Sequence, residues 1–123
     1  MSWVVVGALL GALAVIAGAF GAHALAARLG SHELALWETA ARYLMYGALA
    51  LVLAGLFGRQ GGVARGGALS GAGWCLFVGS LIFSGTVFAL ALGSPRWLGA
   101  ITPLGGTLLI AGFLLFAWAA VVR

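Results

Sequence analysis

The sequence predicts an all-α fold, a four-helix transmembrane bundle with up-down-up-down topology and short turns. Of its 123 residues, 64% are hydrophobic and 7% are charged. A soluble domain carries about 25% charged residues, so lipid must be the solvent for most of this surface. Three short breaks rich in glycine, serine, proline or arginine separate the long apolar stretches. Because unpaired backbone is costly in lipid, each stretch is expected to be helical, and residues 1–123 are expected to form one integral membrane domain.

The first two helices are expected to form a hairpin around Gly30 and Ser31. The first covers about residues 3–29. We interpret it as a retained membrane helix, because no Lys or Arg precedes it and its apolar run exceeds the roughly 7–15 residues of a signal-peptide core. The second covers about residues 32–57. Its first turns, with Trp37, are expected at the membrane interface, where tryptophan is favoured.

The last two helices are expected over about residues 68–92 and 97–122. The sequence GRQGGVARGG at 58–67 is the strongest loop signal in the chain, and GSPR at 93–96 separates the two helices. Four spans place both termini on one side of the membrane. Three arginines on that side, against two or three on the other, slightly favour cytoplasmic termini in a bacterial inner membrane.

Charge and cysteine usage exclude several classes of protein. The net charge of +4 comes from six arginines and two glutamates. The arginines are scattered singly, which is typical of loop charges that set membrane topology, so no nucleic-acid partner is expected. The single cysteine, Cys75, excludes an intrachain disulfide and a cysteine cluster for zinc, and we expect it to be a small core residue.

Six of the ten Arg, Glu and His side chains lie between His23 and Arg42. If Gly30 and Ser31 form the tip of a hairpin, His23 and Glu38 lie at the same depth, about 10 Å below the tip. Arg42 lies one turn deeper than Glu38 on the same helix face. These three side chains are therefore expected within the membrane.

The second hairpin is expected to bring more polar residues into the same leaflet. Ser84 and Thr86 precede its tip, and Thr102 and Pro103 follow it. Pro103, deep in the expected helix, frees a backbone carbonyl that Thr102, Thr107 or a water could satisfy. The candidate site is a polar cluster for a ligand or for structure, consisting of His23, Glu38, Arg42, Tyr43, Ser84, Thr86, Thr102 and Pro103.

Two interpretations of this cluster stay open. An ionisable residue inside a membrane indicates a functional site by default, here one for an ion, a small ligand or a lipid headgroup. The alternative is a structural clasp, in which Glu38 and Arg42 neutralise each other and His23 bridges to Glu38. We favour the clasp, because structural ion pairs produce the same pattern.

No enzyme, catalytic residue, metal site or cofactor is expected. A metal needs three or four convergent His, Cys, Asp or Glu ligands, and His23, Glu38 and His32 make a poor set with an arginine among them. Nothing supplies a nucleophile elbow with its oxyanion hole, and the glycine-rich loop lacks the Lys-Ser/Thr ending of a phosphate-binding loop.

Two functional hypotheses follow. The first is a non-enzymatic accessory or structural membrane protein. The second is an oligomeric small transporter or channel that uses His23, Glu38 and Arg42. We favour the first, because the chain lacks a second buried acid and shows no inverted repeat of the kind many transporters carry. Glycines at helical spacing favour close helix contacts, so a homo-oligomer in the lipid bilayer is expected as well.

Several short motifs occur in a recognisable order: GAFGAH at 18–23, WET at 37–39, RY at 42–43, FSG at 83–85 and TPLGG at 102–106. Together they resemble the YgdD family (domain of unknown function 423), which is similar to the transmembrane protein 256 family. The resemblance implies a four-pass helical membrane protein and no established activity. The family pattern has a polar residue at the position of Leu44 and a histidine at that of Gly47, so this chain lacks one group that a shared proton relay would use.

Overall fold

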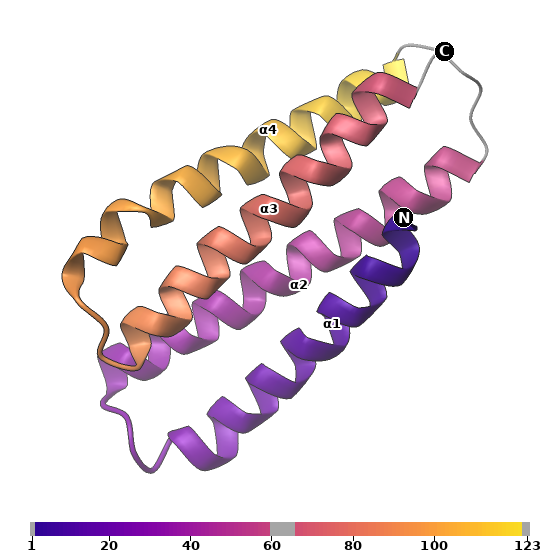
Figure 1. Ribbon diagram of the computed structural model, residues 1–123. Coiled ribbons are helices and arrows are strands. Elements are labelled where there is room, and N and C mark those ends of the chain that lie inside the picture. Colours follow the sequence, from indigo (N-terminus) through magenta and orange to yellow (C-terminus); the bar gives the residue numbers. More distant parts are fainter. Residues whose placement is uncertain (1, 60–65, 122–123) are drawn as a thin grey trace.

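The computed structural model of the chain describes residues 2–59 and 66–121 and contains four long helices (Figure 1). These are α1 (Trp3–Phe20), α2 (Ser31–Arg59), α3 (Gly66–Ala91) and α4 (Thr102–Val121). A π-helical segment, η1 (Gly21–Leu25), continues α1, and a 3-10 segment, η3 (Arg96–Ala100), precedes α4. The structure has four spans long and apolar enough to cross a membrane, which confirms the predicted all-α transmembrane fold. Most of the predicted 58–67 loop, residues 60–65, and residue 122 lie outside the described residues.

The helices pack in chain order, and each lies mainly against the next one. In Figure 1 they follow one another as α1, α2, α3 and α4, and α1 begins at the same end of the molecule where α4 ends. This agrees with the predicted up-down-up-down order. Over the described residues, however, α1 and α4 share no extended contact, so the bundle is open along one side.

Glycines allow the helix backbones to approach closely within the chain. Gly105 of α4 lies against the backbone of α3, and a Cβ at this position would meet Phe83. A Cβ at Gly7 of α1 would lie 2.6 Å from the carbonyl oxygen of Ala48 in α2. In lipid, helices associate through such close packing. Gly7 and Gly105 are therefore used for helix contacts inside the chain, whereas a Cβ at Gly18 would meet open space.

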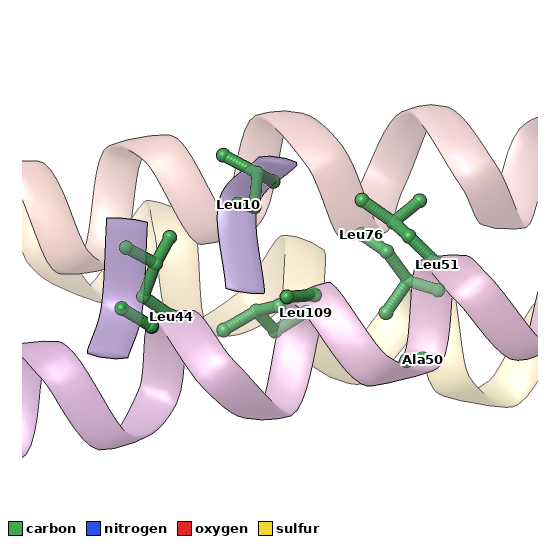
Figure 2. Close-up of a cluster of buried hydrophobic side chains, with 8 residues drawn as sticks. Leu10, Leu44, Ala50, Leu51, Leu76 and Leu109 are labelled. Carbon is green, nitrogen blue, oxygen red and sulfur yellow. The ribbon is translucent and has the colours of Figure 1, made fainter. Parts of the chain in front are cut away.

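The core is a group of leucines and alanines centred on α2. Figure 2 shows Leu44 and Leu51 of α2 among leucines of the other three helices, which are Leu10, Leu76 and Leu109. Leu51 and Leu76 are fully buried. Because one side of α2 is filled by these contacts, its opposite side is left facing outward.

The turn after α3 ends that helix with a specific backbone motif. Gly93 adopts a positive φ of 96°, and the backbone N–H of Ser94 donates to the carbonyl of Ala89 over 3.0 Å. This six-to-one hydrogen bond with a left-handed glycine is a Schellman motif. It closes α3 at Ala91, next to the expected end at 92.

The expected position of Pro103 deep in a helix is wrong. The chain forms a 3-10 turn at Arg96–Ala100, and α4 begins only at Thr102. Pro103 therefore occupies the first turn of α4, where its missing N–H leaves no helix hydrogen bond unmade. The Thr107 hydroxyl donates to the carbonyl of Pro103 over 2.8 Å.

Candidate functional site

Ser84 connects the two hairpins inside the bundle. Its side chain is 1% exposed, and its hydroxyl donates to the carbonyl of Ala40 in α2 over 2.9 Å. A backbone carbonyl inside a helix keeps a second lone pair after its own helix bond, so it can accept this proton without breaking α2. The bond fixes the height of α3 relative to α2.

Thr86 and Thr102 join the end of α3 to the start of α4. Their hydroxyl oxygens lie 2.7 Å apart and share a hydrogen bond. Thr86 also lies 2.7 Å from the carbonyl oxygen of Ile82, and Thr102 lies 3.3 Å from that of Leu98. We call Ser84, Thr86 and Thr102 the hydroxyl seam. The partners of all three hydroxyls are within the chain.

Trp37 has a role that the sequence did not indicate. Its indole N–H donates to the carbonyl of Ala17 in α1 over 2.7 Å, and its ring packs on Phe88 of α3 with centroids 4.5 Å apart. The ring also occupies the space that a Cβ at Gly21 would need. Gly21 is the first residue of the π-helical segment, so Trp37 connects α2 to α1 at the point where the α-helix becomes a π-helix. It is half-buried in the bundle and not simply an interface residue. The sequence signal that could have indicated this contact is Gly21, whose missing Cβ leaves room for a large ring from α2.

The charged members of the predicted cluster lie on the outside. Glu38, Arg42 and His23 are exposed, and Tyr43 is 38% exposed. In residues 2–59 and 66–121, Glu38 forms no ion pair with Arg42 or His23. The structure therefore does not form the intrachain clasp that we favoured from the sequence. Depth counting gives the level of a side chain but not its direction around the helix.

Glu38 and Arg42 belong to a continuous exposed face of α2, opposite the core. Its residues repeat every three or four positions, and we call it the outer face of α2: Ala35, Glu38, Arg42, Tyr46, Leu49, Leu53 and Leu56. From the middle of Ser31–Arg59, Arg42 is displaced by about 5 Å and Glu38 by about 10 Å along the helix. The hydrocarbon half-thickness is about 15 Å. With the membrane centred on the middle of α2, both charges would fall within the hydrocarbon thickness, and both side chains are exposed on the surface of the bundle.

Two pockets flank this region, and neither is lined by Glu38, Arg42 or His23. One is an apolar groove of about 350 Å³ between α2, α3 and α4, lined by Tyr43, Tyr46, Phe83, Gly106, Leu109, Ile110 and Phe113. The other, of about 480 Å³, lies at the tips of both hairpins and is lined by His32, Glu33, Leu36, Leu90, Ser94, Arg96 and Gly99. These two pockets therefore exclude Glu38 and Arg42, while the second pocket includes other charged residues, Glu33 and Arg96.

A second buried serine differs from Ser84. The Ser80 side chain is 0% exposed, and its hydroxyl has no hydrogen-bond partner in the described structure. It fills the space that a Cβ at Gly47 would take. Sequence reasoning did not single out this contact, because neither residue is ionisable.

The described residues contain no group of three or more His, Cys, Asp or Glu side chains that could hold a metal ion. His23 and Glu38 are both exposed. Within that part of the chain, the hydroxyls of the seam form hydrogen bonds inside the bundle, and the charged side chains Glu38 and Arg42 lie on its surface.

Comparison with known proteins agrees with the resemblance seen in the sequence. The family model "Protein of unknown function (DUF423)" matches residues 17–106. The UPF0382 membrane protein SH2409 of Staphylococcus haemolyticus is 42% identical over 92% of this chain and 89% of its own length. The UPF0382 membrane protein YwdK of Bacillus subtilis is 40% identical over 97% of this chain and 95% of its own length. No solved structure matches. The chain therefore belongs to the DUF423 family, and it is similar throughout its length to the UPF0382 membrane proteins.

Proposed function

We propose that this protein is a non-enzymatic accessory or structural protein of the bacterial cytoplasmic membrane, with cytoplasmic termini, that binds another membrane component through the outer face of α2. One observation carries the proposal. Glu38 and Arg42 are exposed on a helix that is long and apolar enough to cross a membrane, and they form no ion pair within the described chain. A charged side chain facing lipid costs about 2.5–3.5 kcal/mol on insertion scales, so a partner that covers both charges would be stabilised strongly.

The positions of the other polar groups support binding over transport. A transport site needs a water-accessible path to its ionisable residues, and the two pockets beside α2 do not include Glu38 or Arg42. The hydroxyls of the seam donate their hydrogen bonds within the chain, so none of them is free to donate to a transported anion. Its role in the proposal is to hold α2 in place, so that the charged face is presented on a rigid support.

The proposal can be tested by water access to Arg42. In a Cys75→Ala background, Arg42→Cys and Ser94→Cys variants are treated in membranes with a water-soluble maleimide. We expect labelling at position 94, in the turn after α3, and protection at position 42. Wild type and Glu38→Gln, reconstituted in proteoliposomes, should show equal proton and cation leak. Rapid labelling at position 42, together with flux that Glu38→Gln abolishes, would overturn the proposal in favour of an oligomeric transporter.

A further inference from the structure

We infer that the component bound by the outer face of α2 is a second copy of this chain, docked through the same face, with Glu38 of each copy paired to Arg42 of the other. This inference rests on the proposed function and names its partner. The face carries one acid and one base and is therefore complementary to itself. A two-fold axis converts two unpaired charges into two reciprocal ion pairs, which is the self-complementarity that an isologous interface requires.

The membrane fixes the geometry of such a pair. Copies inserted in the same direction can be related only by an axis along the membrane normal, so the two α2 helices run parallel and identical residues meet at the same depth. Glu38 and Arg42 are four residues apart, about 6 Å along the helix. Long side chains on adjacent turns of parallel helices span that offset, as they do in coiled coils.

The rest of the outer face continues the same contact toward the other leaflet. Leu49 and Leu56 lie seven and fourteen residues after Arg42, on the same line along α2, and they are 54% and 44% exposed. A repeat of seven residues keeps a seam between two parallel helices over several turns. The charges therefore set the register, and the leucines extend the packing.

The exposed faces of α1 and α4 are stable in contact with lipid and do not need a protein partner. The large exposed residues of α1 and α4 are apolar, as at Leu9 of α1 (63% exposed) and Leu114 of α4 (65% exposed). Lipid tails solvate such side chains as well as a protein would. Only the α2 face presents a carboxylate and a guanidinium that lipid tails cannot pair, among the helix faces described in the structure.

Disulfide cross-linking tests the contact directly. Leu49→Cys is made in the Cys75→Ala background and oxidised in membranes, with Leu9→Cys and Leu114→Cys as exposed controls on α1 and α4. A disulfide needs Cα atoms within about 7 Å, so we expect a dimer band only for Leu49→Cys. No dimer at position 49, or equal dimer at all three positions, overturns the inference.

Charge exchange tests the reciprocal pairs. Glu38→Arg alone and Arg42→Glu alone place four like charges at the contact, and each should weaken the Leu49→Cys dimer roughly three- to thirtyfold. The double variant with both changes restores opposite charges and should restore the dimer. Circular dichroism of each variant checks that the helices still form. A folded double variant that stays monomeric, or single variants that dimerise as well as the parent, would show that the pairs do not exist.

The two proposals fail in different ways. If Arg42→Cys is protected from the maleimide but Leu49→Cys yields no dimer, the accessory role stands and its partner is another molecule. If the dimer forms but Arg42→Cys is labelled and flux depends on Glu38, the contact is correct and the proposed function is wrong.

Discussion

Ser84 of the hydroxyl seam contacts the core side of α2, and the outer face of α2 lies on the opposite side of that helix, where the polar groups differ in burial and in pairing. Ser84 is buried and bonded to Ala40 within the chain. Glu38, only two residues from Ala40, is exposed and has no ionic partner in the described residues. Neutral hydroxyls can be satisfied by the spare lone pairs of helix carbonyls, whereas a carboxylate or a guanidinium needs a charged partner.

This difference separates stability from recognition. The seam joins α2, α3 and α4, and removing its bonds should destabilise one molecule on its own. The charges of the outer face form no ion pair within the described residues of one molecule, and removing them should affect only what that molecule binds. Four substitutions can break or sharpen this comparison.

The largest effect is expected where α3 and α4 touch. In Gly105→Ala, the new Cβ meets the backbone of Phe83, which cannot move aside as a side chain can. We expect a loss of about 1–3 kcal/mol in the free energy of unfolding, measured by thermal denaturation in detergent. Gly106→Ala is the matched control. Its Cβ would lie 3.7 Å from the ring of Phe83, an ordinary contact, and stability should be kept or improved. Equal losses in both variants would mean that α4 does not pack in this register.

Next comes the bond between the hairpins. Ser84→Ala removes the donor to Ala40 and should lower the free energy of unfolding by roughly 0.6–2 kcal/mol. Ser80→Ala is the control, because it changes an equally buried serine one turn away whose hydroxyl has no partner. That variant should be neutral or slightly stabilising, since it removes an unsatisfied polar group. If both serines cost the same, the hydroxyl seam is not what joins the two hairpins.

Trp37→Phe should have a smaller effect. It removes the indole donor to Ala17 but retains an aromatic ring for Phe88 and Gly21. We expect a loss of about 0.5–1.5 kcal/mol and faster amide hydrogen exchange in the π-helical segment at 21–25. Trp97→Phe, at a position that is 63% exposed, should leave both measurements unchanged. Unchanged exchange at 21–25 in Trp37→Phe would show that the indole does not hold the π-helical turn.

The smallest effect on unfolding is expected from Arg42→Ala. With no ion pair inside the described chain, its loss should not measurably lower the melting temperature of the protein in detergent, at a dilution where it is monomeric. A loss as large as that of Ser84→Ala would restore the intrachain clasp and remove the contrast between the seam and the outer face.

The sequence predicted the fold because composition alone decides it. Long apolar stretches between short polar breaks admit few solutions in lipid, and the four spans follow. Depth counting from the two tips also placed Thr86 and Thr102 at one level, and they share a hydrogen bond. Level depends only on the rise per residue, which is nearly the same in every helix.

Sequence reasoning missed features that depend on which way a side chain points around its helix and on the contacts between segments. Glu38 and Arg42 were expected to pair within the chain, but the core of leucines around Leu44 and Leu51 turns their side of α2 outward. Pro103 was placed inside a helix because the sequence RWLGA of the 3-10 turn before it does not differ clearly from the start of an apolar helix. The contacts of Trp37 could be predicted only by knowing that Gly21, at the end of α1, lies opposite its ring. Each of these outcomes is set by contacts between segments.

The packing of helices in chain order has a consequence for how the protein is made. Each of α2, α3 and α4 packs against the helix synthesised just before it, and in the described part of the chain α1 and α4 share no extended contact. Contacts between consecutive segments close small loops and form quickly. We therefore expect the chain to assemble one hairpin at a time during synthesis, with the charged side of α2 formed before the last span enters the membrane.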